Sequence, residues 1–313
     1  MSAPQSNRRL RNKVHSQLTA LHHGGQFAVP TAVQRCLNDS LIEQIVHEYR
    51  AGCPNAPTHG RAAIITAGVP GAGKSFAVDM LGAGYRRIDS DEIKDLILMR
   101  LEWAGLLDIR HNHVLADGRP VHPCELARWV HDASTDAANR VRAVSLRLGE
   151  NFVMEGTLSW KPLVGSYVTD LASDDYEHLT IVDVEVPFTL ALEQSRVRWW
   201  AAREAERTKN GIELGGRFIA HAALESFYTR QRRVSKCAAN ARSLQSAANN
   251  AGIETDLLCV TRTLTGREYR AWLRPDGDID TSQDAPLGAV CINTGAILTN
   301  PTAIRAGVRS SRA

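Results

Sequence analysis

Residues 68–75, with the sequence GVPGAGKS, constrain the fold of this chain more than any other stretch. Three glycines, a proline and a lysine pack poorly, yet they lie between two apolar runs, 62–67 and 76–81. The first run is typical of a buried strand and the second of a helix. The sequence therefore predicts a glycine-rich turn that leads from a strand directly into a helix.

The spacing of this turn is that of a phosphate-binding loop, the Walker A motif. Glycines let the backbone curl so that successive N–H groups point at one anion. Lys74 would reach the terminal phosphates of ATP, and the Ser75 hydroxyl would be a ligand of Mg²⁺. Alternatively, the stretch could be a structural turn that matches the Walker A spacing by chance. The strand and helix expected on either side disfavour this alternative. The residues expected to contact the nucleotide are Gly68, Gly71, Ala72, Gly73, Lys74, Ser75 and Phe76.

Composition and charge exclude several other classes of protein. The 313 residues are 43% hydrophobic and 23% charged, which is ordinary for a globular protein with a sizeable core. A net charge of +3 gives no indication of a nucleic-acid partner, and no apolar run is long enough to span a membrane. Six cysteines without a C-x-x-C pair predict neither a zinc site nor a disulfide framework. We therefore expect a cytoplasmic protein.

Strand-like and helix-like runs alternate along the chain, which predicts an α/β fold, a mostly parallel sheet with helices on both faces. Strands are expected at 62–67, 85–89, 151–155, 179–186, 254–262 and 268–273. Helices are expected at 31–49, 92–103, 127–148, 162–171, 188–207 and 218–248.

Three regions follow from this pattern. Residues 1–30 are polar and are interpreted as a solvated leader, so that 1–58 contains this leader and one docked helix. Residues 59–274 are expected to form the main domain. Residues 275–313 are weakly periodic and are interpreted as a C-terminal tail.

Acidic residues follow two of the predicted strands, at the sheet edge where α/β proteins bind ligands. The segment 86–95 contains Asp89 and Asp91 directly after a strand. Both could cap the next helix, but capping explains one aspartate better than two. In the segment 151–160, a strand ends at Glu155-Gly156-Thr157, which offers an acceptor and a donor around a glycine that permits close approach.

Basic residues that could neutralise a migrating phosphate lie further along the chain. Most of them are expected to form a solvated basic face. One or two could contact the γ-phosphate of ATP, and an arginine behind a flexible Gly-Gly pair suits a lid. The candidates are one helical group and one arginine after Gly-Gly: Arg196, Arg198, Arg203, Arg207 and Arg217.

Taken in order, the motifs GVPGAGKS, IDSDE, MEGT, an arginine helix after VEVP, and GGR resemble the zeta toxin family of P-loop kinases, over about residues 60–240. The resemblance implies a P-loop kinase fold and an enzyme that uses ATP and Mg²⁺. Zeta toxins phosphorylate the 3′-hydroxyl of the amino sugar in UDP-N-acetylglucosamine. The resemblance also implies a small helical antitoxin protein that blocks the ATP site.

Single positions receive roles from this resemblance. Asp91 would be the catalytic base, and Arg198 and Arg217 would contact the migrating phosphate, with Arg196 as the alternative to Arg198. Lys74 would complete the catalytic set. The residues expected to bind the acceptor are Asp89, Asp91, Asp136, Glu155 and Thr157.

Three departures from the family pattern concern the acceptor. Val69 stands where glutamine is usual, Ser159 stands where arginine is frequent, and Asp136 matches only with a short insertion. A kinase of another hydroxyl compound, such as an antibiotic, a nucleotide or a polynucleotide end, is therefore an alternative. A non-catalytic nucleotide-binding module is a further alternative, which Asp91 disfavours because nucleotide binding alone needs no base.

Overall fold

The computed structural model describes residues 3–53, 57–79, 81, 83–206, 208–230, 234–265, 267–274 and 278. The predicted C-terminal tail therefore lies outside the described residues, except for Asp278. Contacts divide the chain into two units, each made of several segments. We call Met1–Gly52, Asp89–Val141 and Ser195–Ala220 the helical unit, and Cys53–Ile88, Arg142–Gln194 and His221–Ala313 the sheet unit. The domain boundaries expected after residues 58 and 274 remain predictions.

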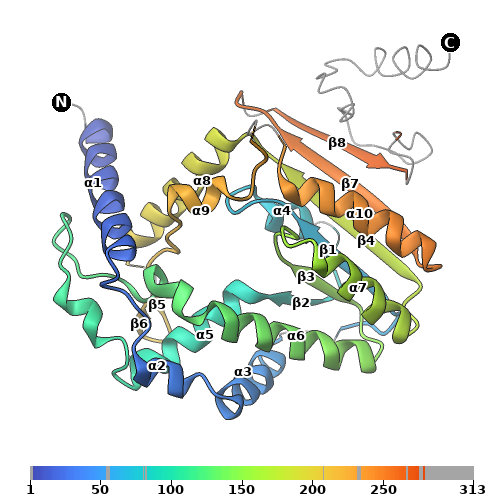
Figure 1. The fold of residues 1–313 in the computed structure, drawn as a ribbon, viewed down its shortest axis with the longest axis horizontal. Helices are drawn as coiled ribbons and strands as arrows, with labels where there is room; N and C mark the ends of the chain where they lie inside the picture. The colour runs from blue at the N-terminus through green and yellow to red at the C-terminus, as the bar shows by residue number, and fades with distance from the viewer. Residues whose placement is uncertain are drawn as a thin grey trace. The chain divides into compact units, whose positions relative to one another are not determined.

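The sheet unit is built on a six-stranded sheet with the order β2-β3-β1-β4-β7-β8 (Figure 1). β1 pairs in parallel with β3 and β4, β4 pairs in parallel with β7, and β8 is an antiparallel edge strand. The mostly parallel α/β sheet predicted from the sequence is confirmed. The strands are β1 Ala62–Ala67, β2 Arg86–Asp89, β3 Phe152–Glu155, β4 His178–Glu185, β7 Glu254–Arg262 and β8 Glu268–Leu273.

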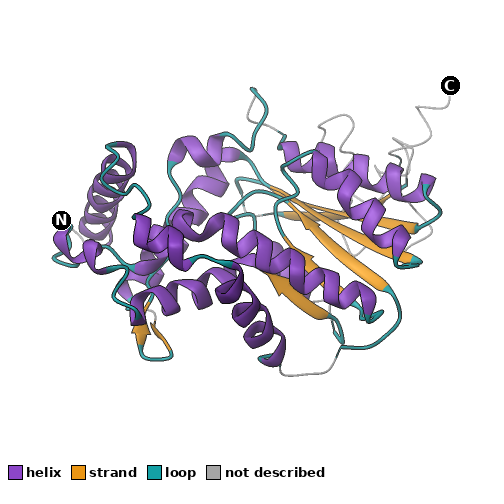
Figure 2. Ribbon diagram, turned by 60° about the horizontal axis from the view of Figure 1, so that its bottom comes forward, coloured by secondary structure: helices purple, strands orange, loops and turns teal. Residues whose placement is uncertain are grey.

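Helices lie along the strands of this sheet (Figure 2). α10 packs against α7, β4 and β7, whereas α4 packs against β1, β3 and β4. The connection through α4 runs toward β2, and those through α7 and α10 run toward β7, so right-handed crossovers place α4 on the opposite face. The helices are α4 Lys74–Asp79, α7 Pro162–Ser173, α9 His221–Glu225 and α10 Lys236–Asn250.

The central strand β1 is buried on both faces, and it positions the loop 68–75. Ala63, Ile64, Ile65 and Ala67 are each at most 2% exposed. Such a continuous apolar run is typical of a parallel strand covered by helices on both sides. Because parallel strands end at the same edge, the loop shares that edge with the ends of β3, β4 and β7.

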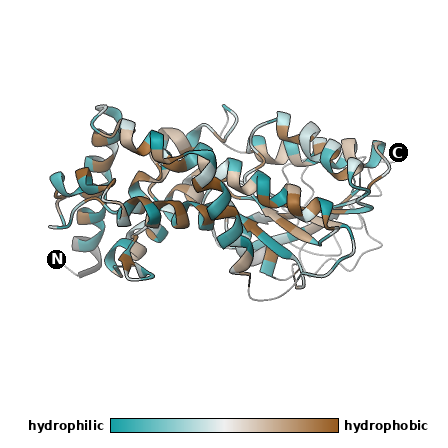
Figure 3. Cartoon of the chain, turned by 90° about the horizontal axis from the view of Figure 1, so that it is seen from below, coloured by the Kyte–Doolittle hydropathy of each residue, from teal (hydrophilic) through white to brown (hydrophobic). Residues whose placement is uncertain are grey.

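The helical unit contains α-helices of 6 to 21 residues, and α5 packs against α3 and η2. Helices of the chain carry both hydrophobic and hydrophilic residues (Figure 3), as expected for helices that bury one face. A two-stranded hairpin, β5 Thr208–Lys209 and β6 Ile212–Glu213, was not expected from the sequence. The helices are α1 Ala3–His23, α2 Thr31–Cys36, α3 Asp39–Ala51, α5 Ser90–Trp103 and the 3₁₀ helices η1 Asp108–Asn112 and η2 Pro123–Val130, with parts of α6 His131–Arg147 and α8 Phe188–Glu204.

Two helix predictions are wrong because capping residues interrupt the pattern. The expected helix 31–49 is split at Leu37, and Asn38 caps α3 by accepting a hydrogen bond from the Leu41 N–H (3.1 Å). The expected helix 218–248 is split between α9 and α10, where the Ser235 hydroxyl accepts from the Ala238 N–H (3.2 Å).

The expectation of a solvated leader at residues 1–30 is also wrong, because α1 packs against other segments of the helical unit. The His15 ring lies 4.8 Å from the Phe218 ring and 5.6 Å from that of Trp199, measured between centroids. The His22 ring stacks on Phe218 at 5.4 Å. Since Phe218 directly follows Arg217, α1 supports the segment that carries this predicted arginine.

The sequence analysis expected neither a membrane-spanning segment nor a zinc site, and the described residues can be compared with both expectations. Among them, no helix combines the length and apolar character needed to cross a bilayer. No group of three or more His, Cys, Asp or Glu side chains in this part of the chain is arranged to hold a metal ion. The described cysteines are free thiols: Cys36, Cys53, Cys124, Cys237 and Cys259.

Leu18→Ala is expected to lower the free energy of unfolding by about 2–5 kcal/mol, because it removes a fully buried side chain of α1 and leaves a cavity. Ser16→Ala, at an exposed position of the same helix, is the control and should change it by less than about 0.5 kcal/mol. Urea unfolding followed by circular dichroism measures both. Equal stability of the two variants would contradict the packing of α1.

Candidate functional site

The loop 68–75 has three glycines with positive φ angles, as expected for a phosphate-binding turn. Gly68, Gly71 and Gly73 have φ angles of +132°, +84° and +85°, which residues with a side chain rarely adopt. A Cβ atom at Gly68 would lie 2.5 Å from the Val184 carbonyl oxygen of β4. The Gly68 N–H donates to the Thr157 carbonyl after β3 (3.1 Å). The spacing that predicted a phosphate loop therefore coincides with a backbone that only glycines allow.

Lys74 and Ser75 lie at the end of this loop. Lys74 Nζ donates to the carbonyls of Gly68 (2.8 Å) and Val69 (3.1 Å), so the ammonium group is held against the loop backbone. Ser75 Oγ donates to Glu155 Oε2 (3.2 Å). A hydroxyl and a carboxylate in contact are the oxygen ligands that Mg²⁺ prefers. These two side chains therefore fit a Mg²⁺ ion that also binds phosphate oxygens.

Glu155 is buried at the end of β3, with 6% exposure. Its second carboxylate oxygen accepts a hydrogen bond from Arg87 Nε, and Arg87 Nη1 donates to Asp79 Oδ1 (2.9 Å). Arg87 thus compensates the buried charge of Glu155. The acceptor-binding role expected for Glu155 remains a prediction, and its contact with Ser75 fits a metal ligand equally.

Asp91 is the centre of a charged cluster in the helical unit. It lies in the first turn of α5, where Asp89 caps the helix by accepting a hydrogen bond from the Asp91 N–H (2.8 Å). Lys94 Nζ donates to Asp91 Oδ1 (2.9 Å), and Arg217 Nη1 lies 3.8 Å from Oδ2. Burial raises the pKa of Asp91, but Lys94, Arg217 and Arg198 together outweigh it and lower the pKa to about 2. Asp91 is therefore an ionised carboxylate at neutral pH.

Arg217 is fixed to the same turn of α5. Its Nη2 donates to the Asp91 carbonyl (2.6 Å) and to Asp95 Oδ1 (2.8 Å). Asp95 is 1% exposed, and its Oδ1 also accepts from the Cys124 thiol (3.3 Å). Arg198 is an exposed residue of α8 whose charge acts on Asp91. The structure therefore gathers Asp89, Asp91, Arg198 and Arg217 in one cluster.

The Gly-Gly pair before Arg217 is packed, so the flexibility expected from its sequence is wrong. A Cβ atom at Gly216 would overlap the backbone of Trp199, and one at Gly215 would overlap the His122 ring. Gly215 also has a φ angle of +67°. Both glycines therefore allow the segment before Arg217 to lie close to Trp199 and His122.

The remaining predicted residues have other surroundings. Asp136 on α6 forms an ion pair with Arg140 (2.9 Å), which also pairs with Asp39 (2.6 Å). Thr157 Oγ1 lies 3.0 Å from Ser159 Oγ. Phe76 belongs to α4, but its side chain lies outside the described residues. The acceptor-binding roles expected for Asp136 and Thr157 remain predictions.

Sequence reasoning missed four charged residues that contact predicted site residues. Lys94 and Asp95 stand three and four positions after Asp91, a helical spacing that could have indicated them. Arg87 and Arg262 carry no local signal, because their partners Glu155 and Ala72 are 68 and 190 residues away in the sequence.

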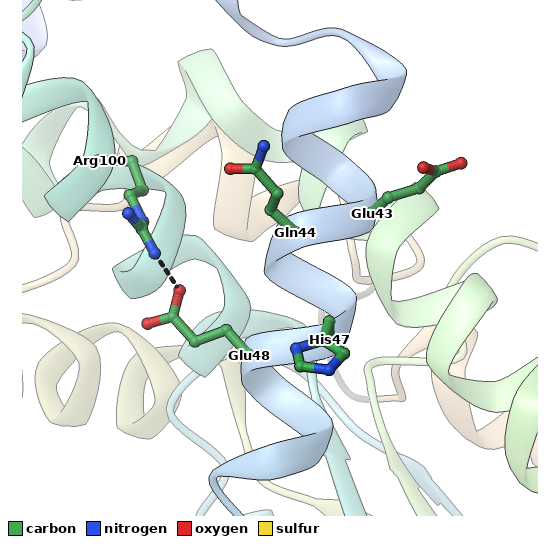
Figure 4. Close-up of a pocket in the computed structure, with 5 residues that line it drawn as sticks. All are labelled: Glu43, Gln44, His47, Glu48 and Arg100. Atoms are coloured by element: carbon green, nitrogen blue, oxygen red, sulfur yellow. Dashed lines mark hydrogen bonds and ion pairs between the residues drawn. The ribbon is translucent and has the colours of Figure 1, made fainter.

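A surface hollow of about 540 Å³ lies between α3 and α5 of the helical unit (Figure 4). Across it, Arg100 donates to Glu48 Oε2 (2.7 Å). Arg100 is nine residues after Asp91, which is about 13 Å along the helix, so the hollow is separate from the Asp91 cluster. Its lining is charged and polar: Glu43, Gln44, His47, Glu48 and Arg100.

Comparisons with known proteins give distant likenesses. No protein-family model matches the chain. A calmodulin calcium-dependent NAD kinase from Arabidopsis thaliana is 28% identical over 102 residues, which cover 32% of this chain and only 18% of that protein.

Two solved structures share parts of the architecture. One comes from the PezAT chromosomal toxin–antitoxin system of Streptococcus pneumoniae, with a TM-score of 0.48, 11% identity, and 88% and 94% of the two chains covered. The other is AvrRxo1-ORF1:-ORF2 with ATP, with a TM-score of 0.43, 12% identity, and 80% and 70% covered.

Lys94→Met is expected to raise the pKa of Asp91 from about 2 toward its ordinary value of 3.8, because it removes a cation 2.9 Å from the carboxylate. Because the pKa of Asp91 is lower in the native state than in the unfolded chain, ionised Asp91 stabilises the fold at every pH above its ordinary pKa of 3.8. This stabilisation is lost as the pH falls through about 2. NMR titration of the carboxyl carbons measures the shift. The control Lys161→Met removes an exposed charge, and equal titration of Asp91 in both variants would contradict the cluster.

Proposed function

We propose that this chain is an ATP-dependent phosphotransferase that resembles zeta toxins and transfers the γ-phosphate of ATP to a hydroxyl of a small nucleotide-linked acceptor. The observation that carries this proposal is the contact between Ser75 and Glu155 (3.2 Å) at the end of a loop whose glycines have positive φ angles. A glycine-rich turn without a ligand needs neither this hydroxyl–carboxylate pair nor a lysine held inside it. UDP-N-acetylglucosamine is the first candidate acceptor, on the strength of the motif resemblance.

In phosphoryl transfer the protein mainly positions the two substrates and neutralises the charge of the migrating phosphate, and it needs no covalent intermediate. In this proposal the loop N–H groups and Lys74 bind the β- and γ-phosphates. Ser75 and Glu155 would hold Mg²⁺, which neutralises developing charge on the phosphate oxygens when it is bound. The present contacts of Lys74 with two loop carbonyls would be exchanged for contacts with phosphate.

Asp91 has the properties needed on the acceptor side. It is ionised at neutral pH and can accept a hydrogen bond from the attacking hydroxyl, then its proton. A carboxylate with a pKa of about 2 is a weak base, which suits a loose transition state in which the proton moves late. Arg198 and Arg217 would stabilise the migrating phosphate. The loop and the Asp91 cluster belong to different units, and each role is proposed from the residues of its own unit.

NAD is a second candidate acceptor. The stretch of 102 residues that matches an NAD kinase favours it. The departures at Val69 and Ser159 from the zeta toxin pattern weaken the assignment of UDP-N-acetylglucosamine. Both candidates are diphosphate-linked nucleotides that carry sugar hydroxyls. Incubation of the chain with Mg²⁺, ATP and either compound, followed by mass spectrometry, distinguishes them by which one gains a phosphoryl group. ATP hydrolysis that neither compound stimulates would favour an acceptor of another class.

We also propose that the protein acts as a toxin in the cytoplasm and that a small helical antitoxin blocks its ATP site. Induced expression of the wild type should then stop growth, whereas a variant without Lys74 should not. Normal growth under wild-type expression, with active enzyme in the lysate, would contradict the toxin role.

Lys74→Ala is expected to reduce phosphoryl transfer to background while the fold stays intact, because Lys74 supplies charge in a loop rather than packing. Transfer of labelled phosphate and thermal unfolding measure the two properties. Lys161→Ala, at an exposed position, is the control. Near-normal turnover in Lys74→Ala would overturn the assignment of the phosphate loop.

Asp91→Asn is expected to lower the single-turnover rate by about 10² to 10⁴, the usual contribution of a positioned general base. Asparagine keeps the shape of aspartate, and Asp89 provides the helix cap, so the protein should stay folded. Its melting temperature should fall modestly, because the ion pair with Lys94 is lost. Asp89→Asn is the matched comparison and should have the smaller effect on rate. Full activity of Asp91→Asn would exclude it as the base.

Arg198→Ala is expected to lower kcat by about 10³ or more with little change in ATP affinity, as for an arginine that contacts the migrating phosphate. Arg196→Ala, two positions earlier on α8, is the matched control. An unaffected Arg198→Ala beside an inactive Arg196→Ala would transfer the role to Arg196.

A further inference from the structure

Arg262, the last residue of β7, contacts the phosphate loop from outside the motif. Its Nη1 donates to the Ala72 carbonyl (2.8 Å), although the two residues are 190 positions apart. A Cβ atom at Gly73 would collide with this guanidinium. The Arg262 side chain is only 18% exposed. Arg262 therefore occupies space beside the loop that is open only because residue 73 is a glycine.

The contact fixes the orientation of one peptide group. The peptide between Ala72 and Gly73 is planar and trans, so its C=O and N–H point in opposite directions. Because Arg262 holds the carbonyl toward β7, the Gly73 N–H must point away from β7. In a phosphate loop, N–H groups at these positions are the donors that surround the anion.

Arg262 is itself held in place by the edge strand β8. Glu268 lies directly opposite Arg262 in the β7–β8 pairing, and its Oε2 accepts from Arg262 Nε (2.7 Å). Glu268 Oε1 accepts from Arg270 (2.7 Å). Because Nε is bound to Glu268, the plane of the guanidinium is fixed, and Nη1 is directed at the loop.

We propose that Arg262 is a positioning residue for the nucleotide: by holding the Ala72 carbonyl it turns the Gly73 N–H toward the bound phosphates. This inference rests on the proposed function, since it assumes that the loop binds ATP. It adds a residue from the far end of the chain to a site that the Walker A motif defines locally.

The test compares Arg262→Met, Arg262→Lys and Arg270→Met in direct binding of Mg²⁺-ATP by isothermal titration calorimetry. Methionine keeps most of the side-chain length without a donor, so Arg262→Met should weaken ATP binding roughly 10-fold or more, as for loss of a charged hydrogen-bond donor. Arg262→Lys keeps a donor and should recover part of the affinity. Arg270→Met removes an equal charge from the same ion-pair group and should bind ATP nearly as the wild type does.

A second readout separates positioning from stability. In protein without nucleotide, the Gly73 amide resonance should shift in Arg262→Met and stay in place in Arg270→Met, while thermal unfolding of the two variants should be similar. Wild-type affinity and an unmoved Gly73 resonance in Arg262→Met would overturn this inference alone. A wild-type protein that does not bind Mg²⁺-ATP at all would overturn the proposed function together with it.

Discussion

The conformation of the loop 68–75 depends on hydrogen bonds and contacts from strands that lie far away in the sequence. Thr157 after β3 accepts from the Gly68 N–H, β4 approaches Gly68 closely, and Arg262 of β7 holds the Ala72 carbonyl. A curled backbone with positive φ angles is costly in isolation, because its polar groups find few partners within the loop. The parallel sheet supplies these partners, since the strands end at one edge. The conformation of the loop is thus a property of the whole sheet edge.

In the helical unit, neighbouring cations keep a half-buried carboxylate, that of Asp91, ionised. Asp91 has Lys94 and Arg217 beside it, and Arg217 is in turn held by the buried Asp95. Each partner compensates a charge that would be costly if it were buried alone. Two acidic and two basic side chains on neighbouring segments therefore form a group in which removing any one leaves an unbalanced charge.

Local patterns predicted the elements that carry local signals. The Walker A spacing predicted the loop, and the apolar run at 62–67 predicted a strand that is central and buried. The helix breaks before α3 and α10 were missed because the capping residues Asn38 and Ser235 are polar, and polar residues also fit the exposed face of a continuous helix. α1 was missed because its many charged residues concealed the spacing of four between Leu10, Val14 and Leu18.

Contacts between distant segments of the chain were not predictable from the sequence. Nothing near Glu155 in the sequence indicates that Ser75 and Arg87 meet it, and nothing near Arg262 indicates the loop. Asp91 could be selected from the sequence, and Lys94 three positions later could have indicated part of its low pKa. The further lowering by Arg217 and Arg198 could not be predicted, because both lie more than a hundred residues downstream.

The low pKa of Asp91 has a consequence for control of the protein. A carboxylate that stays ionised down to a pH of about 2 does not change its charge within the range of pH that a living cell experiences. Acidification within this range therefore leaves the charge of Asp91 unchanged, and the three cations Lys94, Arg217 and Arg198 all favour its ionised form. The charge of the Asp91 cluster is therefore constant at cellular pH, so control of this region has to act through its accessibility rather than through its protonation.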